Sequence, residues 1–194
     1  MSLLQFSEPT GTTVTLKTNM GDMSIMFFPS EAPKCVENFI THCKNGYYNG
    51  LLFHRVIKNF MIQSGDPEGT GMGGESIWGH GLADEYSDNL FHFKGAVCMA
   101  KSNRPNSIGS QFYIVDGEAV GKKLARDLKK NYPEEVVSKY MEIGGYPFLD
   151  KKYTVIGQVF DGINVISKIA GKKTDYNDRP YEDVIIENVE VNEK

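Results

Sequence analysis

The chain has 194 residues, with 25 Asp and Glu against 21 Lys and Arg, and a formal net charge of −4. A chain of this length can bury one good core, so we expect a single domain over residues 1–194. The acidic balance argues against nucleic-acid binding, which normally needs a basic surface. The sequence has no run of about 18 consecutive apolar residues, so it predicts no membrane span.

The cysteines and the opening residues indicate a compartment. Cys35, Cys43 and Cys98 cannot all form pairs, and none lies in a Cys-x-x-Cys motif. The opening residues carry neither a basic leader nor an apolar stretch of signal-peptide length, so the sequence predicts no export. Reduced thiols in the cytoplasm are therefore the expectation.

The first residues predict a hairpin and a helix. Residues 13–18 and 23–28 alternate as strands around a turn in which Gly21 can supply a positive φ. Pro33 then suits a first helical turn. Apolar residues at helical spacing follow it up to Asn45-Gly46, namely Val36, Phe39, Ile40 and Cys43.

Short strands with glycine-rich or polar connections account for most of the remaining chain. They are expected at residues 52–57, 60–64, 95–100, 110–115, 153–160 and 183–191. A short helix, marked by Val165, Ile166 and Ile169 and ended by Gly171, precedes the last strand. Because strands and helices do not alternate as in βαβ units, the pattern predicts an α+β domain rich in antiparallel strands, with the sheet closed into a barrel.

Residues 116–147 depart from this pattern. Their basic run, Lys122, Lys123, Arg126, Lys129 and Lys130, is better explained as solvated charge than as a surface for an acidic partner. After Pro133, four apolar residues recur at helical spacing, namely Val136, Val137, Tyr140 and Met141. We therefore expect one extra surface helix, packed on the flank of the barrel.

Two strand regions carry the chemistry. In residues 53–66 a Lys58-Asn59 turn separates two strands, and Arg55, Met61 and Gln63 project to one side. In residues 109–115, Gln111 and Tyr113 alternate with two core residues. A guanidinium, a thioether, two amides and an aromatic ring can hold an apolar ring beside fixed donors, which suits peptide recognition.

Other motifs in the chain predict no further site. Residues 69–74 fit G-x-G-x-x-G, but further glycines follow where a nucleotide-binding fold needs a helix. The four histidines lack metal-ligand spacing, so we expect neither a metal nor a cofactor. His54 is interpreted as a strand histidine with its own local hydrogen bonds rather than a general base. Ser107 and Ser110 have no histidine or acid near them in sequence, so hydrolysis is unsupported.

Four ordered blocks resemble one family. They are FHRVIKNFMIQSGD (53–66), GTGMGGESIWG (69–79), MAKSNRPNSIGSQFYI (99–114) and FLDKKYTVIGQVFDG (148–162). The chain resembles the cyclophilins, the cyclosporin-binding peptidyl-prolyl isomerases, over roughly residues 12–192. The 116–147 insertion is similar to that of single-domain bacterial-type members. The resemblance implies an eight-stranded antiparallel barrel capped by two helices, and rotation about Xaa-Pro bonds that assists protein folding.

The resemblance also implies roles for individual residues. Arg55 would be the catalytic donor to the prolyl nitrogen, and Gln63 would hold Arg55 and meet the substrate backbone. The proline pocket would be lined by Phe60, Met61, Tyr113 and Leu149. The groove on the amino side of proline would be formed by Gly71, Ala100, Lys101, Ser102 and Gln111.

Departures from the family pattern affect the binding residues more than the catalytic one. Phe148 and Tyr153 stand where the family has tryptophan and histidine. Lys101-Ser102 replaces an Asn-Ala pair, with one extra residue before Pro105. Tyr113 replaces phenylalanine and would add a hydroxyl at the pocket rim. Because Phe148 has no indole donor, we expect cyclosporin to bind with reduced affinity.

The expected partners are proline-containing peptides and unfolded or folding proteins, bound by a monomer. The rival interpretation is a cyclophilin-fold module that binds proline peptides or other proteins, with incidental isomerase activity. The presence of Arg55 favours the enzyme.

Overall fold

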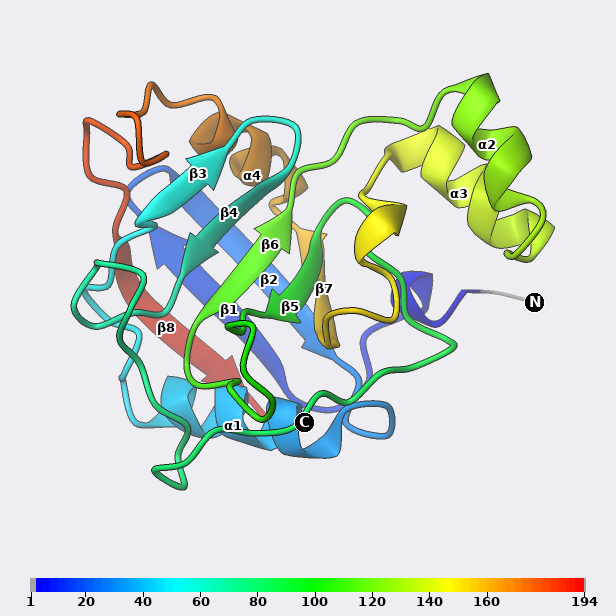
Figure 1. The fold of residues 1–194 in the computed structure, drawn as a ribbon. Coiled ribbons are helices and arrows are strands. Elements are labelled where there is room, and N and C mark those ends of the chain that lie inside the picture. The colour runs from blue at the N-terminus through cyan, green and yellow to red at the C-terminus, as the bar shows by residue number, and fades with distance from the viewer. Residues whose placement is uncertain (1–2, 194) are drawn as a thin grey trace.

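One antiparallel sheet of eight strands forms the body of the molecule (Figure 1). The structure is a computed structural model and describes residues 3–193. The strands follow the spatial order β3-β4-β6-β5-β7-β2-β1-β8. Their bounds are β1 Thr13–Thr18, β2 Gly21–Phe27, β3 Arg55–Ile57, β4 Met61–Ser64, β5 Ala96–Met99, β6 Phe112–Val115, β7 Val155–Asp161 and β8 Ile186–Asn192.

The sheet curls until its two edges meet. Leu52, ahead of β3, forms a bridge with Ile185, ahead of β8. Beside it, the N–H of Phe53 donates to the carbonyl of Val184 at 2.9 Å. The predicted eight-stranded antiparallel architecture is confirmed, and a short bridge between the segments that precede β3 and β8 joins its edges.

The predicted first hairpin is confirmed, with Gly21 at its turn. Thr18 pairs with Gly21, whose φ of 128° lies in the region that favours glycine. A Cβ at this position would lie 2.9 Å from a Val165 methyl carbon, so a larger residue would also press on the helix that packs behind the turn.

Two helices cap the curled sheet, as the resemblance implied (Figure 1). They are α1 (Pro33–Lys44) and α4 (Ile163–Ala170). α1 begins at its proline and buries Val36, Phe39 and Cys43 of the expected stripe, whereas the fourth member, Ile40, is only partly buried against the core. The Phe39 ring lies 5.1 Å, centroid to centroid, from the ring of Phe112 on β6, so this helix packs into the centre of the core.

Strands β4 to β7 are buried on both faces. Ile62, Val97 and Ile114 face the main core, whereas the alternate residues Met61, Cys98 and Tyr113 belong to a second apolar cluster on the other face. The predicted alternation in these strands is confirmed. The second cluster forms the base of the candidate site.

Residues 116–147 contain two helices rather than the one predicted. They are α2 (Lys122–Leu128) and α3 (Glu134–Ile143), and a 3₁₀ turn, η2 (Pro147–Leu149), follows. The basic run therefore lies on and just beyond a helix, α2, which buries Ala125 and Leu128. Because this helix is only seven residues long, its few apolar positions gave a weak periodic signal among many charges.

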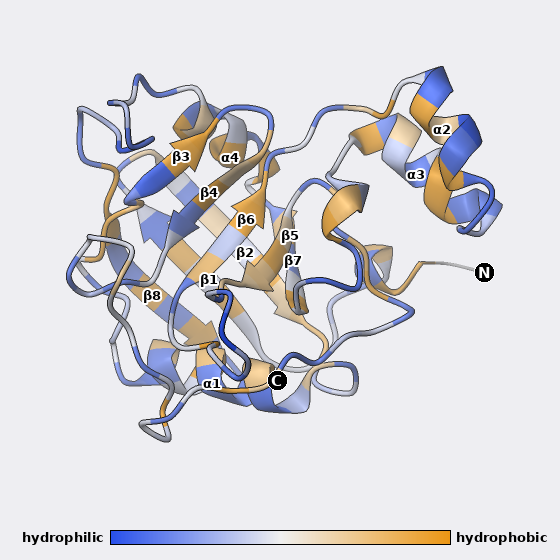
Figure 2. Cartoon of the chain, in the orientation of Figure 1, coloured by the Kyte–Doolittle hydropathy of each residue, from blue (hydrophilic) through white to orange (hydrophobic). Residues whose placement is uncertain are grey.

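The two inserted helices share an apolar core of their own. Figure 2 shows both as alternating bands of hydrophobic and hydrophilic residues. Val136, Val137 and Tyr140 of α3 are buried as predicted and pack with Phe91 and Phe93, in the segment that leads into β5. The prediction was wrong in two details, because Met141 is 39% exposed and because α3 rests on that segment rather than on strands of the barrel.

Candidate active site

A row of paired residues crosses three strands of the site. Arg55 on β3 lies opposite Gln63 on β4, and Gln63 lies opposite Tyr113 on β6. Directly opposed residues project to the same face of a sheet. The turn between β3 and β4 is formed by Asn59, whose φ is 61°, as the Lys58-Asn59 signal predicted.

A cavity of about 160 Å³, which we call the small cavity, opens over this row. Met61 and Tyr113 are buried at its base. Its lining contains most of the predicted site residues, namely Arg55, Phe60, Met61, Gln63, Ala100, Lys101, Tyr113, Leu149 and Tyr153. The cavity combines aromatic and aliphatic walls with a guanidinium.

Arg55 has a partner that the sequence did not reveal. Its side chain is 44% exposed, and its Nε lies 3.6 Å from Oδ2 of Asp178. The N–H of Val56 donates to the carbonyl of Asp178 at 2.8 Å, which fixes that loop beside β3. Asp178 lies more than a hundred positions from Arg55, so no local pattern could have identified it.

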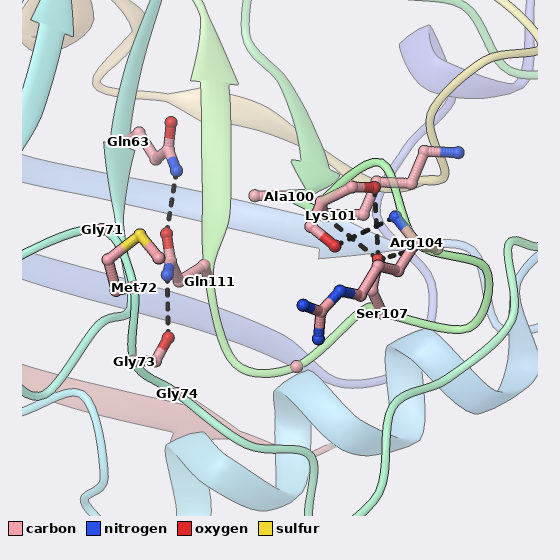
Figure 3. A pocket seen from close by; sticks show the side chains of 12 residues that line it. Gln63, Gly71, Met72, Gly73, Gly74, Ala100, Lys101, Arg104, Ser107 and Gln111 are labelled. Atoms are coloured by element: carbon pink, nitrogen blue, oxygen red, sulfur yellow. Dashed lines mark hydrogen bonds between the residues drawn. The ribbon is translucent and has the colours of Figure 1, made fainter.

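Gln63 is held differently from the expectation. Its Nε2 donates to Oε1 of Gln111 at 2.9 Å, and Nε2 of Gln111 donates to the carbonyl of Gly73 at 2.8 Å (Figure 3). The two amides therefore form a chain that leads away from Arg55. In the described residues the ion pair of Arg55 is with Asp178, and the predicted role of Gln63 in holding Arg55 is not seen.

A second hollow of about 450 Å³, the large hollow, adjoins the small cavity along Gln63, Ala100 and Lys101. Its lining includes the five residues predicted for the amino-side groove, and consists of Gln63, Gly71, Met72, Gly73, Gly74, Ala100, Lys101, Ser102, Arg104, Ser107, Gly109 and Gln111. Within these residues there is no acidic side chain.

Two cations of the large hollow behave differently. Nζ of Lys101 donates to Oδ2 of Asp84 at 2.7 Å and to the hydroxyl of Tyr86 at 2.9 Å, and it lies 5.2 Å from the centre of the Tyr153 ring. Arg104 is exposed and has no acidic partner within residues 3–193. Figure 3 shows its guanidinium extending toward the Gln111 side, while the Lys101 ammonium points away.

The glycine loop of the large hollow is organised around Asp66, which the sequence did not single out. Its carboxylate accepts N–H bonds from Glu68, Thr70, Gly71 and Gly73 at 2.6 to 3.2 Å. Burial would raise the pKa of Asp66, but these four donors outweigh it and lower the pKa below its ordinary value. The G-x-G-x-x-G segment thus surrounds a carboxylate of its own chain.

Two predictions about side chains were wrong. The Tyr113 hydroxyl does not lie at the pocket rim, because Tyr113 is 5% exposed and its hydroxyl lies 3.1 Å from Nε2 of His92. His54 does not make local hydrogen bonds, because both of its ring nitrogens are buried without a partner in residues 3–193. Burial lowers the pKa of His54, which therefore stays neutral at pH 7.

Phe148 is the predicted residue that lines neither hollow. It is 55% exposed on η2, and its ring packs on the ring of Tyr146 at 5.7 Å between centroids.

Neither a metal cluster nor a membrane helix is found in residues 3–193. No group of three His, Cys, Asp or Glu side chains is placed to hold a metal ion there. None of the helices in that range has the length and apolar character needed to cross a bilayer.

Comparisons with known proteins place this geometry in a family. Residues 13–191 match the family model described as cyclophilin type peptidyl-prolyl cis-trans isomerase/CLD. A Staphylococcus aureus (strain USA300) protein named "Putative peptidyl-prolyl cis-trans isomerase" is 50% identical over 181 residues, 93% of this chain and 91% of that protein. A Streptococcus pyogenes protein named "Putative bifunctional phosphatase/peptidyl-prolyl cis-trans isomerase" is 47% identical over 97% of this chain, which spans 40% of it.

Solved structures agree with the sequence relatives. A Cryptosporidium parvum cyclophilin matches with a TM-score of 0.77 and 30% identity, covering 95% of this chain and 99% of that one. The same cyclophilin in the presence of the dipeptide Ala-Pro matches with a TM-score of 0.76 over 94% of this chain. The fold, the length of the match and the identity to the relatives together show that this chain belongs to the cyclophilin-type peptidyl-prolyl cis-trans isomerases.

Proposed function

We propose that this isomerase binds the proline ring of its substrate in the small cavity and that Arg55 catalyses rotation of the Xaa-Pro bond. The reaction crosses a barrier of about 18–20 kcal/mol that comes from amide resonance. In the twisted state the prolyl nitrogen loses its conjugation and gains a lone pair. A donor aimed at that nitrogen stabilises the twisted state more than either planar one, and so lowers the barrier.

The observation that carries this proposal is the position and the partial exposure of the Arg55 guanidinium. It lies beside the small cavity, which has aromatic and aliphatic walls and a volume of about 160 Å³, it is partly exposed, and its ion pair with Asp178 is long at 3.6 Å. Arginine keeps its charge at any relevant pH and offers N–H groups in a rigid fork. One of these groups is therefore free to donate to a substrate nitrogen while Asp178 limits the motion of the side chain.

The large hollow is proposed to hold the peptide on the amino side of proline. Holding that side fixed while the other rotates converts binding into catalysis. Because Arg104 extends into this hollow with no acidic partner among the described residues, and the lining of the hollow holds no carboxylate, the site favours peptides that carry an acidic residue there.

We propose further partners and a location for this protein. Cyclosporin is proposed to bind with reduced affinity, because exposed Phe148 has no donor. Assistance to folding proteins as a monomer in the cytoplasm is proposed, and the three buried, unpaired cysteines support a reducing compartment. The alternative of a binding module is not favoured, because Arg55 lies beside the cavity.

The test is exchange spectroscopy on a short Xaa-Pro peptide with substoichiometric protein. Arg55→Ala should fold normally and lose about 100-fold of turnover, equivalent to about 2.7 kcal/mol of transition-state stabilisation. Arg126→Ala, which removes an exposed arginine of α2, is the matched control and should keep turnover within twofold of wild type. A folded Arg55→Ala variant with wild-type turnover would refute the role of Arg55.

A further inference from the structure

A buried chain of polar groups links the inserted helix α3 to the small cavity. Asp150 is at its centre and is 8% exposed. Its Oδ1 accepts the main-chain N–H of His92 at 2.7 Å and lies 2.8 Å from Nδ1 of the same residue. Its Oδ2 accepts the hydroxyl of Tyr140 on α3 at 2.7 Å.

The chain ends on a wall of the small cavity. Nε2 of His92 lies 3.1 Å from the hydroxyl of Tyr113, and the two rings are nearly parallel, with an interplanar angle of 17°. Because the Asp150 carboxylate can only accept, Nδ1 of His92 donates to it, and Nε2 is the ring nitrogen that faces the Tyr113 hydroxyl. The polar side-chain atoms of Asp150, His92, Tyr140 and Tyr113 are thereby all paired.

Asp150 is also joined through the backbone to a second residue that lines the small cavity. It directly follows Leu149, which also lines the small cavity. One carboxylate therefore connects Tyr113 on β6, Leu149 at the end of η2 and Tyr140 on α3. Arg55 is outside this set, because its ion pair is with Asp178.

We propose that Asp150, His92 and Tyr140 are positioning residues for the small cavity, so that the inserted helices set the shape in which the proline ring is held. This inference rests on the proposed function, since it takes the cavity as the site of the proline ring. Buried polar networks that are fully satisfied hold their members in one arrangement. Loss of one hydroxyl should therefore disturb the cavity walls and leave the donor Arg55 in place.

Tyr140→Phe tests the proposal with little change of packing, because the ring can keep its contact with Phe93 at 4.5 Å between centroids. Loss of one hydrogen bond should raise KM for an Xaa-Pro tetrapeptide about threefold to tenfold. The kcat should stay within about twofold of wild type, because the interaction that is lost serves ground state and transition state alike.

A double-mutant cycle separates positioning from stability. In a Tyr113→Phe background, Tyr140→Phe should raise KM by a smaller factor than in wild type, because the link through His92 is already broken and only the link through Leu149 is left. Val137→Ala is the matched control, since it removes buried packing from the same helix without touching the network. It should lower the thermal midpoint and leave KM at the wild-type value. All kinetics are measured well below the lowest thermal midpoint.

The outcomes are distinguishable from failure of the proposed function. Arg55→Ala is assayed in the same series. If it is inactive and Tyr140→Phe keeps the wild-type KM, the positioning role alone is overturned. If Val137→Ala raises KM as much as Tyr140→Phe, or if the two hydroxyl losses add fully, the effect is one of general stability and the proposal is overturned as well.

Discussion

The small cavity and the large hollow share Gln63, Ala100 and Lys101, but they are built from different kinds of backbone. The small cavity rests on paired strands, where register fixes which residues face the substrate. The large hollow is walled mainly by loops, which are held in shape by the carboxylate of Asp66 and by the amide of Gln111. In the proposed function, the strand-built part is assigned to the reaction and the loop-built part to the choice of peptide, since loops tolerate changes of charge better than paired strands do.

The largest effect in this comparison is expected on η2, at the residue before Leu149 of the small cavity. Phe148→Trp should tighten cyclosporin binding about tenfold, because an indole adds a hydrogen-bond donor and ring area on the exposed face of η2. Turnover of a tetrapeptide should stay within a few-fold, since Phe148 does not line the cavity. Calorimetry on both forms measures the affinity. Equal affinities would show that Tyr113, Tyr153 or Lys101 governs the drug site instead.

The next effect is expected at Asp66, whose carboxylate holds the glycine loop of the large hollow in shape. Asp66→Asn removes the charge that accepts four N–H bonds, and should lower the free energy of unfolding by about 1–3 kcal/mol. KM should rise for peptides long enough to reach the large hollow, and hardly at all for a dipeptide that fills the small cavity. An equal rise for both lengths would contradict the separation of the two regions.

The same variant has a pH signature. The folded-state pKa of Asp66 is lower than its unfolded value, so the carboxylate stabilises the fold above the unfolded pKa, near 4. That contribution is lost as the pH falls through the folded pKa. The difference in unfolding free energy between wild type and Asp66→Asn should thus be constant near neutrality and shrink below about pH 4, as denaturant titrations can measure.

The smallest effect concerns charge in the large hollow. Arg104→Gln should reduce kcat/KM about threefold to fivefold for peptides with glutamate on the amino side of proline, the size expected of an exposed ion pair. Matched peptides with glutamine should be unaffected, and added salt should erase the difference in wild type. Arg126→Gln controls for net charge. A loss that is equal for both peptides would show that Arg104 shapes the hollow without selecting charge.

Periodicity alone was enough to predict most of the strand-built region. Alternation placed Arg55, Met61 and Gln63 on one face, because a strand has a period of two whatever covers it. The same rule separated Tyr113 from its core neighbours, and Pro33 with its apolar stripe predicted α1. These are local properties, so each is encoded within a few residues.

Tertiary structure decided what those faces meet. The partner of Arg55 is Asp178, the Tyr113 hydroxyl meets His92 rather than solvent, and Gln63 is bound by Gln111. Local alternation determines the side on which a residue lies but not the distant segment that closes over that side. The helix α2 and the four bonds to Asp66 depend in the same way on packing and loop closure, because only the folded chain brings their partners within hydrogen-bond or van der Waals distance.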